Sequence, residues 1–216
     1  MKNFFAPLFN KPKADKIQVV DPKKILFTVP TLSDDIAPLE PLGEKPSSKD
    51  FGFHEDEWCQ IEFFPKSQLK TIQQILKEYK QFEQAHRAHQ GWNAVYVRKV
   101  QRVPVLSSNQ PTENLEKLLG AKAGNAPFLF TYGALSGKVK NGFTIPLGEN
   151  ITIYGYVDGD NIPVLGANVG KNPDDSRLTD AFLKLNAREG LFLVDWRAQL
   201  LILGASSDSQ VEVWRP

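Results

Sequence analysis

Apolar residues recur every three or four positions between residues 66 and 89, which is the spacing of one face of an α-helix. Lysine, glutamine and arginine occupy most of the opposite face, and Gly91 follows as a helix stop. A helix with one apolar face needs a sheet or other helices to cover that face. Strand-like segments flank it at residues 58–64 and 92–100. The sequence therefore predicts a globular fold that combines a long helix with β-strands.

The remainder of the chain continues this mixture. A short helix is expected at residues 111–119 and a longer one at 173–189, each followed by a glycine. The Asn-Gly dipeptide at 141–142 favours a hairpin over residues 138–145. Further strands are expected at 128–132, 151–157, 191–196, 200–203 and 211–214. We therefore expect an α+β fold of mostly antiparallel sheet, covered by two main helices at 66–89 and 173–189.

Prolines separate the first 50 residues from the rest, because this segment holds seven of the fifteen. Proline fixes φ and removes a backbone donor, so we expect residues 1–50 to form an extended arm along an edge of the fold. The arm has one strand-like segment, residues 25–29, which Pro30 ends. Residues 51–105 and 106–216 are expected to form a first and a second α+β half, which can pack as one domain.

The two halves share a short pattern that suggests an internal duplication. Arg98 follows Gly91 by seven positions, as Arg197 follows Gly190, and valine occupies position 95 and position 194. Two related halves of about 100 residues explain this match. Coincidence explains it as well, since the order helix, glycine, strand is common.

Bulk properties exclude several classes of protein. The net charge of +1 gives no global attraction to nucleic acid or to acidic membranes. No apolar run approaches the length that spans a bilayer, which is about 18 residues or more. The single cysteine, Cys59, cannot form an intramolecular disulfide, which suits a reducing compartment. We expect a soluble, cytoplasmic protein with no membrane contact.

Charged residues are concentrated in one acidic run and at two strand ends. The run His54-Glu55-Asp56-Glu57 precedes a predicted strand. Arg98 and Arg197 end two predicted strands, where an arginine pairs with a carboxylate such as Glu62 or Asp195, or clamps an anionic ligand. The candidate partner-binding residues are therefore His54, Glu55, Asp56, Glu57, Arg98 and Arg197. A plain solvated turn explains the acidic run equally well.

A metal site is the alternative interpretation of the acidic run. Imidazole and carboxylate groups bind divalent metals, and His86 near the end of the long helix could complete such a site. The four candidate ligands are His54, Asp56, Glu57 and His86, which would serve a metal-assisted hydrolase. Against this hypothesis, the run has none of the recognised metal-ligand spacings, and four consecutive residues of a strand cannot all point one way.

A third hypothesis is weak nucleic-acid binding through the basic helix face. Residues 33–57 contain eight acidic and two basic side chains, whereas residues 66–102 contain eight basic and two acidic. The basic stripe has almost no interleaved aromatic residues, and the acidic segment can neutralise it, so this hypothesis ranks below the others.

Catalytic signatures are missing from the sequence. It has no nucleophile elbow, and Cys59 lies next to Trp58 in a predicted strand, where a buried thiol is inert. It also has no phosphate-binding loop, and the glycine-containing segment 166–170 reads as a turn. We expect no catalytic residue and no cofactor. The segregated charge instead favours a non-enzymatic module, of the immunity or adaptor type, that binds another protein. The sequence does not determine an oligomeric state.

Overall fold

The computed structural model describes residues 26–41, 46–47, 50–131, 134–205 and 211–216. It confirms the predicted α+β class, with sheets that are largely antiparallel. Within these residues the α-helices are α1 (Leu69–His86), α2 (Pro111–Leu119) and α3 (Asp175–Glu189). Residues 1–25, half of the predicted proline-rich arm, lie outside the described residues.

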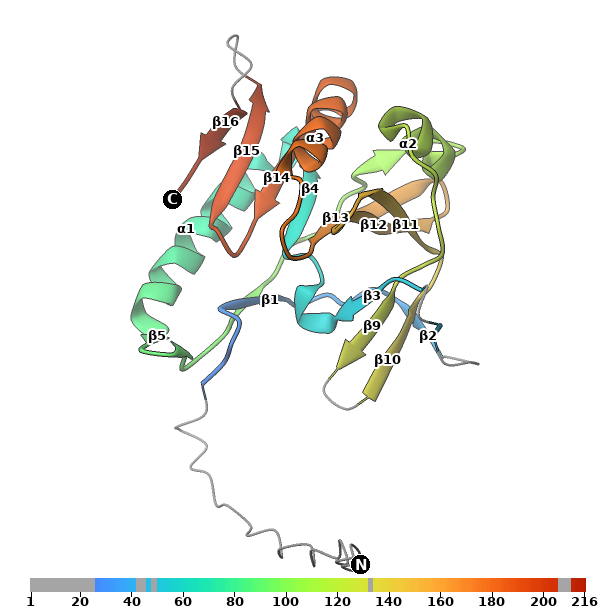
Figure 1. Cartoon of the computed structure of the whole chain (residues 1–216). Helices are drawn as coiled ribbons and strands as arrows, with labels where there is room; N and C mark the ends of the chain where they lie inside the picture. The colour runs from blue at the N-terminus through green and yellow to red at the C-terminus, as the bar shows by residue number, and fades with distance from the viewer. Residues whose placement is uncertain (1–25, 42–45, 48–49, 132–133, 206–210) are drawn as a thin grey trace, which may run out of the picture.

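An eight-stranded antiparallel sheet runs through the molecule (Figure 1), in the order β11-β12-β13-β4-β14-β15-β16, with β8 also paired to β13. Its strands are β4 (Ile61–Pro65), β8 (Leu106–Ser107), β11 (Gly142–Gly148), β12 (Ile151–Asp158), β13 (Asn161–Val169), β14 (Leu191–Asp195), β15 (Leu200–Ala205) and β16 (Val211–Trp214). Strand β4 comes from the first predicted half and lies between β13 and β14 of the second. The two predicted halves therefore share one sheet.

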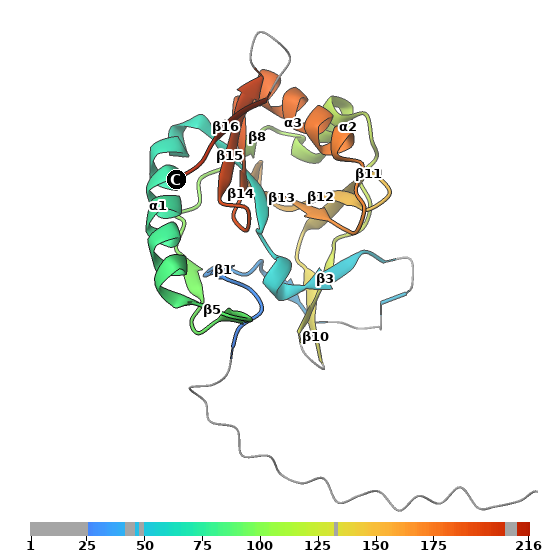
Figure 2. The same cartoon turned by 60° about the vertical axis from the view of Figure 1, so that its left-hand side comes forward.

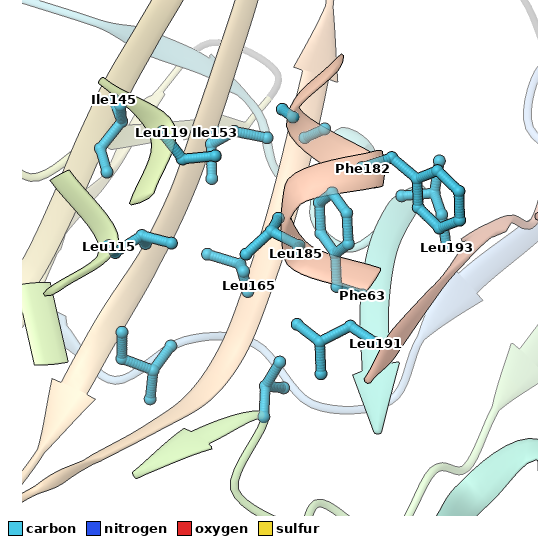
Figure 3. Close-up of a cluster of buried hydrophobic side chains, with 14 of the residues drawn as sticks. Phe63, Leu115, Leu119, Ile145, Ile153, Leu165, Phe182, Leu185, Leu191 and Leu193 are labelled. Atoms are coloured by element: carbon cyan, nitrogen blue, oxygen red, sulfur yellow. The ribbon is translucent and has the colours of Figure 1, made fainter. Parts of the chain in front are cut away.

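Helices cover both faces of this sheet. Figures 1 and 2 show α1 on one side of β14 and β15 and α3 on the other. The cross-strand pair Phe63 and Leu193 packs in the core with α2 and α3, which Figure 3 shows, whereas the next pair, Phe64 and Phe192, packs with α1. This alternation is the two-residue period of a strand buried on both faces. Helix α2 was not among the two helices predicted to cover the sheet. It also packs against the core, where it buries Leu115.

The helix ends follow local sequence signals. Helix α2 occupies the predicted 111–119, with proline in its first turn and Gly120 at a φ of 72° after its end. Helix α3 begins at residue 175, two residues later than predicted, because Asp174 is the cap and accepts a hydrogen bond from the Ser176 amide at 3.2 Å. Helix α1 is shorter than the predicted 66–89. A 3-10 turn, η3 (Lys66–Gln68), precedes it, and Arg87 leaves it as extended backbone.

A second sheet, in the order β2-β10-β9-β3, packs against the first. Its strands are β2 (Leu39–Glu40), β3 (Gly52–His54), β9 (Phe128–Thr131) and β10 (Ala134–Val139). The predicted hairpin at Asn141-Gly142 is wrong, because β10 pairs with β9 and β2 while β11 pairs with β12. A Cβ on Gly142 would lie 2.9 Å from the carbonyl oxygen of Val139. The glycine therefore permits a sharp passage from one sheet to the other.

The predicted strand at 25–29 is replaced by a shorter contact. Phe27 forms an isolated bridge with Trp92, and the strand β1 (Thr31–Ser33) begins only after Pro30. The predicted strand 92–100 is also divided, into β6 (Gly91–Trp92), which pairs with β5 (Arg87–Ala88), and β7 (Tyr96–Arg98), which pairs in parallel with β1. We call residues 26–33 the strap, because they lie along the β6–β7 region.

The two sequence runs that suggested a duplication differ in structure. The first, from Gly91 to Arg98, makes two short strands outside the large sheet. The second, from Gly190 to Arg197, contains β14, a central strand of that sheet. Arg98 is completely buried, whereas Arg197 is exposed. The matched residues therefore occupy unlike positions.

Gly166 lies within β13 and not in the predicted turn, and we expect Gly166→Ala to destabilise the fold. A Cβ at this position would lie 2.5 Å from the ring of Tyr154, a fully buried residue whose hydroxyl accepts a hydrogen bond from the Cys59 amide at 2.8 Å. Overpacking of this kind costs about 1–3 kcal/mol in the free energy of unfolding, which urea denaturation followed by circular dichroism will measure.

Gly204→Ala in β15 is the matched control for this experiment. The nearest atom to a Cβ at Gly204 is an Asn186 side-chain oxygen at 3.4 Å, which is an ordinary contact. We expect its free energy of unfolding to change by no more than about 1 kcal/mol. Equal effects of the two substitutions would contradict the steric role assigned to Gly166.

Candidate functional site

The acidic run forms a single 3-10 turn, η2 (Glu55–Glu57), between β3 and β4. His54 caps the turn, since its Nδ1 accepts a hydrogen bond from the Asp56 amide at 3.2 Å. The Asp56 carboxylate also lies 3.3 Å from this nitrogen, so the imidazole contacts the same turn twice. Trp58 and Cys59 follow in a turn, not in the strand predicted at 58–64, and Cys59 has a φ of 55°.

Glu57 and Arg197 form an ion pair on the surface, although they are 140 positions apart. Their side chains lie 2.5 Å apart and are 36% and 42% exposed. The pairing of β4 with β14 brings them together, because Ile61 is opposite Asp195 and the Trp196 amide donates to the Gln60 carbonyl. We call this pair the ridge. Two of the six candidate partner-binding residues thus meet.

The ridge separates two hollows, each of about 360 Å³. The first hollow is lined by Thr28, Val29, Pro30, Glu57, Glu83, Trp92 and Arg197. The second hollow is lined by Glu57, Gln60, Ile61, Ala167, Asn168, Val169, Asp195, Arg197 and Ala198. Glu57 and Arg197 belong to both linings, so a molecule that enters either hollow meets the ridge.

Exposed apolar side chains adjoin the first hollow. Leu26 and Phe27 of the strap are 40% and 44% exposed. Two backbone hydrogen bonds between Phe27 and Trp92, of 2.8 and 3.1 Å, hold the strap in place. Gly91 has a φ of 112°, and a Cβ there would lie 2.4 Å from the Phe27 carbonyl oxygen, so only glycine allows this approach. The surface around the ridge therefore combines apolar and charged groups.

A third hollow, of about 410 Å³, lies beside α2. Its lining consists of Gln110, Glu113, Glu116, Lys117, Gly120, Ala121 and Lys122. None of the predicted site residues is among them. One of its carboxylates, Glu116, already accepts hydrogen bonds from Lys122 and from the Ala123 amide. This hollow is therefore separate from the candidate site.

Arg98 lies inside the molecule and not on a surface where a partner could reach it. It is completely buried, donates to the Thr31 hydroxyl at 2.9 Å and the Cys59 carbonyl at 2.8 Å, and lies 4.8 Å from the ring centre of Trp196. Burial lowers its pKa, which the charge of Glu62 partly offsets. Its expected role in partner binding is therefore replaced by a role inside the fold.

Arg102 forms two ion pairs, with Asp35 and with Glu62. It donates to the Asp35 carboxylate at 2.7 and 3.0 Å and to Glu62 at 2.5 Å, and Glu62 also accepts from the Trp196 indole at 2.7 Å. Burial opposes the charge of Arg102, but the carboxylates of Glu62 and Asp35 outweigh it and raise the pKa. Burial likewise opposes the charge of Asp35, but its bonds to Arg102 hold the pKa below its ordinary value. The network joins Asp35, just after the strap, to β4.

The Cys59 thiol is fully buried against this network. Burial, with the nearby charge of Glu62, raises its pKa well above the usual value, so the thiol is protonated at neutral pH. A protonated, enclosed thiol is neither a nucleophile nor a metal ligand. The sequence-based expectation of an inert cysteine agrees with this environment.

The four candidate metal ligands do not converge. His54 caps the η2 turn, Glu57 is in the ridge, and His86 contacts Asn93 through its Nδ1 at 2.9 Å. Among the described residues, no group of three or more histidine, cysteine, aspartate or glutamate side chains is placed to hold a metal ion. The basic surface invoked for nucleic-acid binding contains fewer side chains than the sequence suggested, because Arg98 and Arg102 point into the fold.

Sequence reasoning missed Gln60, Glu83 and Trp92 as parts of the site. They come from separate elements, and no local pattern links them to the acidic turn. Comparison of the chain with protein-family models, curated proteins and solved structures found no match. No helix in the described part of the chain has the length and apolar character needed to span a membrane.

Proposed function

We propose that this chain is a non-enzymatic protein-binding module, of the immunity or adaptor type, and that its partner covers the ridge and the two adjoining hollows. The observation that carries the proposal is the exposed Glu57–Arg197 pair between two hollows of equal size. We also infer that the protein acts in the cytoplasm, where its one buried cysteine stays reduced.

The chemistry of this surface supports the proposal. Protein interfaces combine aromatic and apolar contacts with arginine and a polar rim. Here the aromatic groups are Phe27 and Trp92, and the ridge supplies the arginine. Ion pairs that remain exposed contribute little to stability, so this pair adds little to the folding of the chain. Charge placed on a surface instead steers a partner and fixes its orientation.

The rigid support of the surface is a second point in favour. Glu57 and Arg197 lie beside paired strands, and the buried network around Arg102 ties the region after the strap to β4. A preorganised surface loses less conformational freedom when a partner binds. The site therefore resembles a docking surface and lacks the converging acid, base and nucleophile that catalysis needs.

Affinity capture from lysate of the source cell, at low and moderate salt, will test the proposal. We expect one stoichiometric protein that survives moderate salt and is lost with Arg197→Glu, because the substitution sets a second carboxylate beside Glu57. Phe27→Ser should weaken capture as well. With the purified partner, we expect Arg197→Glu to raise Kd by about tenfold or more.

Lys70→Glu on the exposed face of α1 is the matched control, because it also reverses one surface charge but lies away from both hollows. It should leave capture unchanged. Circular dichroism should show that all three variants fold. The proposal fails if no specific protein is captured, or if capture persists with both Arg197→Glu and Phe27→Ser. Loss of capture only with Lys70→Glu would indicate the basic helix face instead.

A further inference from the structure

The second hollow exists because β4 separates from β13 at one end of the large sheet. Strand β4 pairs with β14 over its whole length but with β13 at one position only, Glu62 opposite Gly166. Beyond that position, residues 167–169 of β13 form one wall, and the turn after β14, residues 195–198, forms the other. The gap therefore follows from the way β4 pairs with its two neighbours.

Gln60, one of the residues that line this hollow, carries a buried acceptor without a donor among the described residues. Gln60 is 3% exposed, and its Nε2 donates to the carbonyl oxygens of Thr31 at 2.9 Å and Asp56 at 2.6 Å. Since both partners are acceptors, the orientation of the amide is fixed. Its Oε1 is shielded from solvent and has no hydrogen-bond partner among the described residues. A shielded acceptor of this kind is costly unless a donor reaches it.

Charge in the same hollow favours a cation. Two carboxylates, Glu57 and Asp195, face one guanidinium, Arg197. Arg197 is engaged by Glu57, whereas Asp195 accepts only from the Ala198 amide, at 2.8 Å, and forms no ion pair with any described residue. An anionic ligand would be repelled by this carboxylate, so the charge of the lining disfavours it.

The walls suit an aliphatic stem. Ile61, Ala167 and Val169 contribute apolar side chains to the lining. Lysine and arginine bury their methylene groups against apolar surface while the charged end reaches polar groups. Resting on the function proposed above, we propose that the second hollow receives a lysine or arginine side chain of the protein partner. The charged end lies near Asp195 and beside Gln60, and the stem packs on the apolar wall.

A side-chain analogue tests this assignment without the partner. Nα-acetyl-lysine methylamide and the corresponding arginine compound are the probes, and the norleucine compound has a similar stem without charge. Each is titrated to about 50 mM against ¹⁵N-labelled protein, since a lone side chain binds in the millimolar range. We expect saturable amide shifts at Ile61 and at residues 167–169 and 195–198 with a basic probe, and none with norleucine.

Asp195→Asn is the informative variant. Asparagine keeps an oxygen that accepts from the Ala198 amide, so the turn is retained while the charge is lost. We expect the Kd of the basic probes to rise about threefold or more. Asp180→Asn, an exposed carboxylate on α3, is the control and should leave the Kd unchanged.

The outcomes separate this assignment from the proposed function. Norleucine shifts equal to those of both basic probes, absence of saturable shifts, or an unchanged Kd in Asp195→Asn would overturn the assignment. If Arg197→Glu still abolishes partner capture in that case, the binding module stands and only the occupant of the hollow is wrong. If capture is insensitive to the ridge, the proposed function fails whatever the probes show.

Discussion

Arg102→Met is expected to lower the free energy of unfolding by about 3–5 kcal/mol, because it leaves a buried carboxylate without its cation. Glu62 is 1% exposed and Arg102 is 15% exposed, so neither group is well solvated in the native state. Methionine retains much of the stem but removes the guanidinium, which lies 5.7 Å from the ring centre of Phe64 and bonds to Glu62 and Asp35. Urea denaturation followed by circular dichroism will measure the free energy of unfolding of the variant and of the unsubstituted protein.

Arg197→Met is the matched control, because it removes an arginine from an exposed ion pair. Both partners of that pair are more than one-third exposed, so we expect a loss of no more than about 1 kcal/mol. Similar losses of unfolding free energy in the two variants would show that burial of the Arg102 network does not increase its contribution to stability. A second variant, Glu62→Gln combined with Arg102→Met, should recover part of the loss, because glutamine still accepts from the Trp196 indole but carries no charge.

Short-range signals in the sequence predicted the elements but not all of their partners. The limits of α2 were correct because proline and Gly120 mark both ends, and β9 and β12 appeared within one residue of the expected ranges. The Asn141-Gly142 hairpin failed because a turn signal specifies a sharp reversal, not which strands pair across it. Here the flanking strands prefer partners in two different sheets.

The same limit explains the site. Glu57 and Arg197 could be chosen from the sequence because they are charged and border strands. Their contact depends on the pairing of β4 with β14, across 140 positions, which no local pattern determines. Arg98 was chosen as a partner-binding candidate for the same reason that Arg197 was, since both end a predicted strand. Only the fold distinguishes them, because the strap covers Arg98 and nothing equivalent covers Arg197.

Trp196→Ala is expected to lower the free energy of unfolding by about 3–5 kcal/mol, as much as Arg102→Met. Trp196 is completely buried. Its ring meets the Phe64 ring edge-on, with 6.4 Å between the ring centres, and lies beneath the Arg98 guanidinium. Alanine removes this packing and the donor to Glu62 together. Trp214→Ala, in the partly exposed edge strand β16, is the control and should cost clearly less.

Trp196→Phe divides the two contributions, since phenylalanine retains a ring but not the indole N–H. We expect a loss of about 1–3 kcal/mol, the usual effect of leaving a buried acceptor without its donor. Measured again in the Glu62→Leu background, where that acceptor is absent, the same substitution should cost less. The difference between the two values is the coupling energy of the pair. A coupling near zero would mean that Trp196 supports the Asp195–Arg197 segment by packing alone, independently of the charged network.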